Sequence, residues 1–165
     1  MTFEVVPEID VLIATGIWLH LQGWTIESIS QPRGQGIDIY EERPRLRTKF
    51  SEAQLPTRNL RFNSSGPDIV ARKDSDLWKI ECKGLGTGTT QTLRNNFDRT
   101  LSSTVSYYDQ KSGLRIGLAM PRNSTYLNLI RSRIPQALRE AISLWILIYN
   151  SNDKTINPYE PNIPL

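Results

Sequence analysis

Cysteine and histidine are nearly missing from this chain of 165 residues. Cys82 is the single cysteine and His20 the single histidine. The chain therefore cannot form an internal disulfide or a zinc site built from Cys and His ligands. Any metal ion must be held by oxygen atoms, which favours magnesium, manganese or calcium.

Long apolar runs are missing too. No stretch of eighteen apolar residues occurs, so we expect no membrane-spanning helix. The start of the chain, MTFEVVPEID, carries acidic residues where a signal peptide carries Lys or Arg, and a cytoplasmic protein is expected. With 38% hydrophobic and 22% charged residues, the composition fits a single globular domain over 1–165.

The chain also has little net charge, only +3, so its overall charge barely favours nucleic acid. The distribution of charge is more informative, because basic residues gather in one stretch. Such a stretch can contact phosphate or form a solvated face, and both interpretations stay open. The residues concerned are Arg43, Arg45, Arg47, Lys49, Arg58 and Arg61.

Apolar periodicity predicts a helix from Pro7 to about Gly23 and a strand over 24–29. Residues 31–65 give a poor signal and are predicted to be mostly an irregular insertion or loop, with a short strand candidate at 36–40. The tail 150–165 is predicted to be irregular.

The second half of the chain gives clearer signals for strands and helices. Alternating strands and helices indicate an α/β or α+β fold, with a central mixed β-sheet flanked by α-helices and a core over about 8–149. The predicted elements are strands over 67–72 and 77–83, a helix over 91–108, a strand over 114–120, helices within 124–142 interrupted at Pro135, and a strand over 143–149.

The predicted hairpin GPDIVARKDSDLWKIECKG, residues 66–84, is unusually rich in charge. Strand alternation puts Trp78, Ile80 and Cys82 on a buried face and Glu81 and Lys83 on the other. Cys82 is therefore expected to be a small buried hydrophobe rather than a nucleophile. All four tryptophans of the chain lie in apolar periodic segments, so core packing is favoured over base stacking for each.

A turn centred on Asp74–Ser75 places Asp68 opposite Glu81, on the same face of the sheet. Two carboxylates at that spacing repel by about 3 kcal/mol at an effective dielectric constant of about 20. Lys83 or a bound divalent cation would offset this repulsion. A solvated salt-bridge cluster is the alternative, and a turn one residue longer would remove the pairing.

Pro67-Asp68 followed by Glu81-Cys82-Lys83 resembles the PD-(D/E)XK signature of the restriction-endonuclease-like nucleases. The resemblance implies a restriction-endonuclease-like core and a metal-dependent endonuclease that hydrolyses DNA with Mg2+, or alternatively with Mn2+. Asp68 and Glu81 match the metal-binding acids, with the backbone carbonyl of Cys82 as a further ligand. Lys83 matches the lysine that orients or helps to deprotonate the attacking water.

The same family often adds a glutamate from the first helix, and Glu8 is the candidate here, with Glu4 and Asp10 as alternatives. These acids equally suit the positive end of a helix dipole. Some members use a glutamine after the lysine, which matches Gln91, although a polar residue in a first helical turn is an equal interpretation.

The loop after Lys83 supplies hydroxyl groups that could touch DNA phosphate, notably those of Thr87 and Thr89. Cutting both strands usually needs two active sites, so a homodimer is a reasonable expectation. The competing hypothesis is a catalytically inactive nucleic-acid-binding or assembly module with the same fold.

Overall fold

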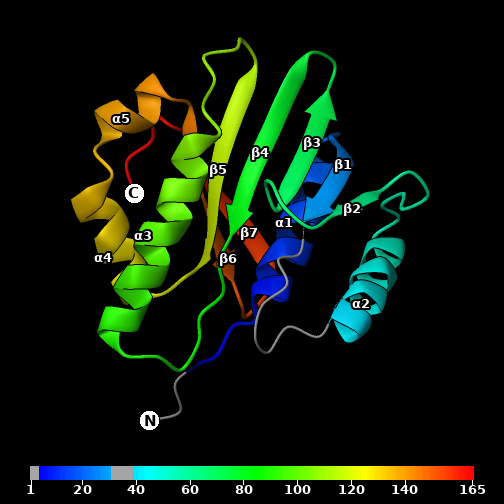
Figure 1. Cartoon of the computed structure of the whole chain (residues 1–165), viewed down its shortest axis with the longest axis horizontal. Coiled ribbons are helices and arrows are strands. Elements are labelled where there is room, and N and C mark those ends of the chain that lie inside the picture. The colour runs from blue at the N-terminus through cyan, green and yellow to red at the C-terminus, as the bar shows by residue number, and fades with distance from the viewer. Residues whose placement is uncertain (1–3, 31–38) are drawn as a thin grey trace.

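The computed structural model describes residues 4–30 and 39–165. Within them, seven strands form one twisted sheet in the order β2-β1-β3-β4-β5-β6-β7 (Figure 1). The pairs β1–β2, β4–β5 and β5–β6 are parallel, and the remaining pairs are antiparallel. The strands are β1 (Thr25–Ser30), β2 (Arg61–Asn63), β3 (Ile69–Lys73), β4 (Asp76–Cys82), β5 (Leu114–Pro121), β6 (Leu144–Asn150) and β7 (Thr155–Tyr159).

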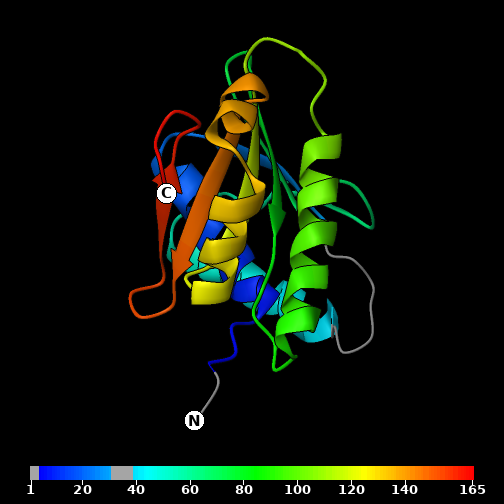
Figure 2. The ribbon, with the colours of Figure 1, turned by 90° about the vertical axis from the view of Figure 1, so that its left-hand side faces the viewer.

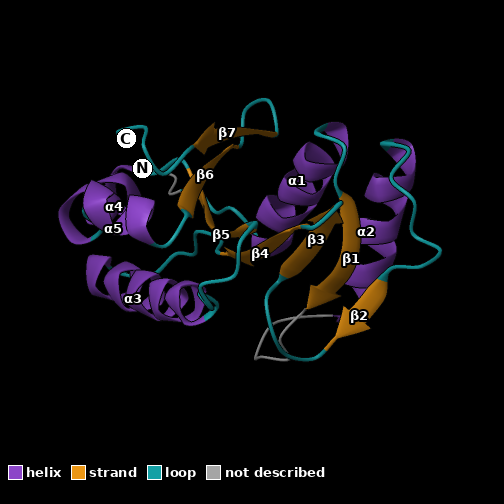
Figure 3. Ribbon diagram, turned by 90° about the horizontal axis from the view of Figure 1, so that it is seen from above, coloured by secondary structure: helices purple, strands orange, loops and turns teal. Residues whose placement is uncertain are grey.

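Helices cover both faces of this sheet (Figures 2 and 3). α1 (Glu8–Leu21) and α2 (Ile39–Glu52) lie on one side, and α3 (Thr90–Ser106), α4 (Ser124–Arg133) and α5 (Gln136–Ala141) lie on the other. The predicted mixed sheet flanked by helices is confirmed. No helix in the described ranges has the length and apolar character needed to cross a lipid bilayer.

α1 buries most of its apolar side chains, although Leu21 at its end is 72% exposed. Pro7 precedes its first turn as the N-cap, and Gly23 ends it with a φ of +84°, a conformation that favours glycine. Gly16 lets α2 approach, because a Cβ there would lie 2.7 Å from the Cζ of Phe50. This contact fixes α2 against α1.

Thr89 caps the start of α3, because its hydroxyl accepts a hydrogen bond from the Thr92 amide. The buried face of α3 follows the helical period of 3.6 residues, so Leu93 and Phe97 are followed by Thr100 and Thr104, whereas Val105 is 36% exposed. The buried residues are Leu93, Phe97, Thr100 and Thr104.

The predicted irregular segment 31–65 is wrong over most of its described part, which contains α2 and β2. Pro44 lies inside α2, and among the side chains described for this helix, residues 42–52, only Leu46 and Phe50 are fully buried, so the apolar pattern is too sparse to predict a helix. The strand candidate 36–40 lies partly outside the described residues, and residues 39 and 40 belong to α2.

The predicted irregular tail is also wrong, because residues 155–159 pair with β6 as the edge strand β7. Pro158 made this strand hard to predict from the sequence, although proline is tolerated in a strand at the edge of a sheet. The last residues are fastened by Arg139 of α5. Its buried guanidinium donates to the carbonyls of Tyr159 at 2.9 Å, Glu160 at 2.6 Å and Ile163 at 2.8 Å.

Candidate active site

The β3–β4 hairpin has the register that brings two acids together. Lys73 pairs with Asp76 and Ile69 pairs with Ile80, around a two-residue turn at Asp74–Ser75. Asp74 has a φ of 54°, as turns of this kind require. The predicted pairing is confirmed, and Asp68, directly before Ile69, falls opposite Glu81.

Asp68 is a buried acid, only 5% exposed. Its Oδ2 atom accepts a hydrogen bond from the Cys82 amide at 2.7 Å, which fixes the carboxyl group against the end of β4. Burial, followed by the charge of Glu81, raises the pKa of Asp68 well above its usual value. The ionised form of the Asp68 carboxyl group is therefore disfavoured in the folded protein.

Glu81 lies on the α3 face of β4, partly buried beside Asp68. The carboxyl groups of Asp68 and Glu81 are close enough to shift each other's pKa. Tyr107, the C-cap of α3, donates its hydroxyl to Glu81 Oε1. Burial raises the pKa of Glu81, and the interactions with Tyr107, Asp68 and Lys83 oppose that rise.

Lys83 extends the site toward α1, where its Nζ atom lies 3.0 Å from Glu8 Oε2. An antiparallel bridge between Val6 and Leu85 brings these two segments together. Gly84 allows the approach, because a Cβ there would lie 2.4 Å from the Val6 carbonyl oxygen and 2.6 Å from the Glu8 amide. The short N-terminal bridge thus places Glu8 beside the end of β4.

Of the three N-terminal acids considered, Glu8 is the one that faces the site. Its charge raises the pKa of both Asp68 and Glu81. Asp10 instead pairs with Arg45 of α2, and Glu4 accepts a hydrogen bond from the Ser151 hydroxyl. The acids of the site therefore come from the residue before β3, from β4 and from α1, beside one lysine.

Cys82 presents its side chain to the opposite face, where it is 2% exposed. Burial raises the pKa of its thiol well above the usual value, so the thiolate needed for nucleophilic attack is disfavoured. The expectation that Cys82 is buried is confirmed. Its backbone amide, by contrast, contributes directly to the site through Asp68.

A magnesium ion fits this donor set only with ligands from outside the protein. No group of three or more His, Cys, Asp or Glu side chains within the described ranges is arranged to hold a metal ion. Magnesium sites commonly use one or two carboxylates and complete their shell with water and substrate phosphate. The touching carboxyl groups of Asp68 and Glu81 match that pattern.

The basic stretch is distributed over α2, the following loop and β2. The guanidinium groups of Arg43 and Arg47 lie over the Phe62 ring, at 4.8 and 4.7 Å from its centroid. Arg45 is paired with Asp10, and Lys49 with Glu52 of its own helix. Arg58 and Arg61 are exposed. Much of this basic surface is thus engaged within the protein.

The remaining predicted site residues lie at the start of α3. Gln91 is exposed and donates its amide to Asn95 at 2.9 Å, so no contact links it to the carboxyl pair. Thr87 is exposed, and Thr89 serves as the helix N-cap. Sequence reasoning missed Tyr107, because a tyrosine at the end of a helix, 26 residues from Glu81, carries no local signal.

Comparison of the chain with protein-family models, curated proteins and solved structures finds no match in any of the three. The class defined by the structure itself is a mixed α/β protein with a sheet covered by helices on both faces. Its candidate active site lies where β3 begins and β4 ends.

Proposed function

We propose that this protein is a metal-dependent endonuclease that hydrolyses DNA phosphodiester bonds, with a restriction-endonuclease-like core. One observation carries the proposal: the hairpin register brings the buried Asp68 carboxyl group into contact with Glu81, beside the Lys83–Glu8 ion pair. A protein that needed only stability would not place two acids together in this way, because their charges repel.

The roles of the residues follow from their positions. Asp68, Glu81 and the Cys82 carbonyl would hold Mg2+, or Mn2+, which when bound lowers the pKa of water and neutralises charge on the phosphate. Lys83 would orient the attacking water and stabilise negative charge as the phosphate reacts. Glu8 holds the Lys83 ammonium at 3.0 Å and thereby sets its position.

The proposed substrate is DNA, and the protein is proposed to act in the cytoplasm as a homodimer. Arg58 and Arg61 are exposed and are proposed to contact the phosphate backbone, together with Arg43, Arg47 and, after exchange of its partner, Lys49. The hydroxyl of Thr87 is free to contribute in the same way.

The test is incubation with linear, supercoiled and branched DNA in magnesium, with EDTA as the metal-free arm. We expect cleavage by the intact protein, and a loss of about 100-fold or more in Asp68→Asn and Lys83→Ala. Asp109→Asn and Lys111→Ala are matched controls, because this exposed ion pair of 3.2 Å has no contact with the carboxyl pair. Both controls should cleave at the normal rate.

Other results separate the alternatives. Tight DNA binding without cleavage in any metal would favour the inactive binding module. If magnesium neither supports cleavage nor raises the melting temperature of the intact protein, the metal site is refuted, because a ligand at 100 times its Kd adds about 2.7 kcal/mol of stability.

A further inference from the structure

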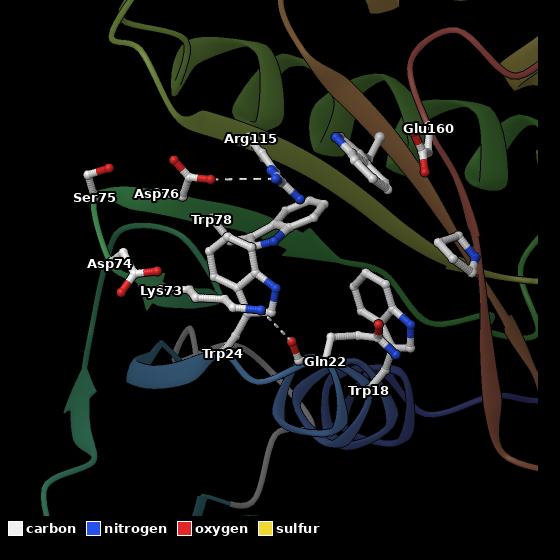
Figure 4. A pocket seen from close by; sticks show the side chains of 12 residues that line it. Trp18, Gln22, Trp24, Lys73, Asp74, Ser75, Asp76, Trp78, Arg115 and Glu160 are labelled. Atoms are coloured by element: carbon white, nitrogen blue, oxygen red, sulfur yellow. Dashed lines mark hydrogen bonds and ion pairs between the residues drawn. The ribbon is translucent and has the colours of Figure 1, made fainter.

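A hollow of about 540 Å³ opens at the turn end of the β3–β4 hairpin. All four tryptophans of the chain line it: Trp18 of α1, Trp24 directly before β1, Trp78 of β4 and Trp145 of β6 (Figure 4). Random burial of aromatic residues would scatter them through the core. Their convergence on one open hollow indicates a binding surface.

This hollow is separate from the candidate active site. Trp78 and Glu81 belong to the same strand, but they lie on opposite faces of the sheet because they are three residues apart. The turn residues 73–76 form part of its rim, whereas the carboxyl pair lies at the other end of the hairpin. A ligand here would be additional to the proposed nuclease substrate.

Trp78 lies at the centre of the aromatic cluster. The rings of Trp18, Trp24 and Trp145 stand edge-on to it, at centroid distances of 6.0, 6.1 and 5.1 Å and interplanar angles of 79°, 77° and 66°. Trp78 and Trp24 are only 1% and 7% exposed, so the expected core packing is confirmed for these two. The half-buried rings of Trp18 and Trp145 are the ones that a flat group entering the hollow could contact.

Arg115 already supplies the cation that this aromatic surface favours. Its guanidinium lies over the rings of Trp24, Trp78 and Trp145, at 5.1, 5.9 and 5.5 Å from their centroids, and 3.5 Å from Asp76. A cationic ligand would be repelled by the positive charge of Arg115. A neutral aromatic ring, in contrast, stacks favourably on both an indole and a guanidinium plane.

The polar rim carries groups of both signs. Lys73, whose Nζ donates to the Gln22 carbonyl at 3.1 Å, and Ser75 of the turn are both exposed. Asp74 and Glu160 present exposed carboxylates that accept hydrogen bonds. The rim thus offers a cation and a hydroxyl to a phosphate, and carboxylates to amino groups.

We propose that this hollow binds a nucleobase that carries an amino group and a phosphate, as in AMP or GMP. The base would stack on Trp18 or Trp145 beside Arg115, its amino group would donate to Glu160 or Asp74, and its phosphate would reach Lys73.

The experiment uses the intrinsic fluorescence of the protein. Because all four tryptophans line the hollow, every emitting indole reports on it. AMP, GMP, IMP and UMP are titrated separately, with excitation at the red edge of indole absorption, and calorimetry gives Kd independently. We expect saturable quenching by AMP and GMP and weaker binding of IMP and UMP, whose bases carry no exocyclic amino group.

Two variants and their controls locate the binding. Trp18→Ala removes one half-buried wall and should weaken AMP binding about tenfold or more, as expected for loss of base stacking. Glu160→Gln should reduce the preference for AMP over IMP. Tyr108→Ala and Glu52→Gln change an exposed aromatic and an exposed acid outside the hollow, and both should bind normally.

A short single-stranded oligonucleotide distinguishes the two sources of the ligand. Tighter binding of the oligonucleotide than of AMP, lost in Trp18→Ala, assigns the hollow to a base of a nucleic acid, whereas preference for AMP assigns it to a free nucleotide. Absence of saturable binding, or equal binding by Trp18→Ala, overturns the proposal. So does tighter binding of tetramethylammonium than of AMP. DNA cleavage by Trp18→Ala should be unchanged, which separates this test from that of the proposed nuclease.

Discussion

Asp68→Asn should stabilise the protein in the absence of metal, although it removes a proposed ligand. Asparagine retains an oxygen that can accept from the Cys82 amide, now bonded at 2.7 Å, and it removes the charge beside Glu81. Side chains directly opposite in an antiparallel pair lie about 5 Å apart, where two carboxylates repel by about 3 kcal/mol at a dielectric constant of about 20. Part of the stability gained by removing this repulsion is offset, because the neutral Asn oxygen accepts a weaker hydrogen bond from the Cys82 amide than the carboxylate does.

The net gain in the free energy of unfolding is therefore expected to be about 1–2 kcal/mol at pH 8. Its pH dependence follows from the raised pKa values of Asp68 and Glu81. Between the ordinary carboxyl pKa of about 4 and the raised values, the folded protein binds more protons than the unfolded chain, so stability falls as pH rises. The advantage of Asp68→Asn should hence grow with pH and vanish below about pH 4.

Urea unfolding at pH 4 to 8, with EDTA or excess magnesium, measures these effects. Magnesium should stabilise the intact protein and leave Asp68→Asn unchanged. Asp109→Asn is a control that should lower the free energy of unfolding, because a backbone hydrogen bond from Lys111 holds the pKa of Asp109 below its usual value and so stabilises its charged form. If Asp68→Asn lowers stability equally at every pH, the two carboxyl groups do not repel and the reasoning fails.

Three further substitutions test the surroundings of the site. Gly84→Ala should destabilise the protein and weaken magnesium binding in thermal unfolding, because its Cβ would lie 2.4 Å from the Val6 carbonyl oxygen; normal behaviour would contradict the tight approach. Tyr107→Phe removes the donor to Glu81 and should cost about 1 kcal/mol and lower magnesium affinity by calorimetry, whereas an unchanged affinity would deny it a positioning role. Phe97→Ala, at a fully buried position of α3, should cost about 3–5 kcal/mol in urea unfolding, and a loss below 1 kcal/mol would show that the core there is loosely packed.

The parts of the fold that the sequence predicts are those with local and unambiguous patterns. The β3–β4 hairpin has a short turn and strict alternation, so its register and its buried face could be derived before the structure was known. α3, α4 and α5 also lie where their apolar spacing and Pro135 indicate. The approach of Asp68 to Glu81 followed from these local features alone.

The parts that could not be predicted depend on contacts between distant segments. α2 exposes most of its surface and contains Pro44, so only its packing on Gly16 of α1 explains its position. β7 contains Pro158 and is a strand because β6 offers it an edge. Within the site, Tyr107 reaches Glu81 across 26 residues, and such contacts leave no trace in either local sequence.

The two ends of the sheet limit how copies of this protein could associate. β2 has only three residues, which is too short to template a long pairing with another chain. β7 carries Pro158, which has no amide hydrogen to give to an incoming strand. A dimer that brings two active sites to one DNA duplex would therefore form through helices or loops, and the sheet would not continue from one copy into the next.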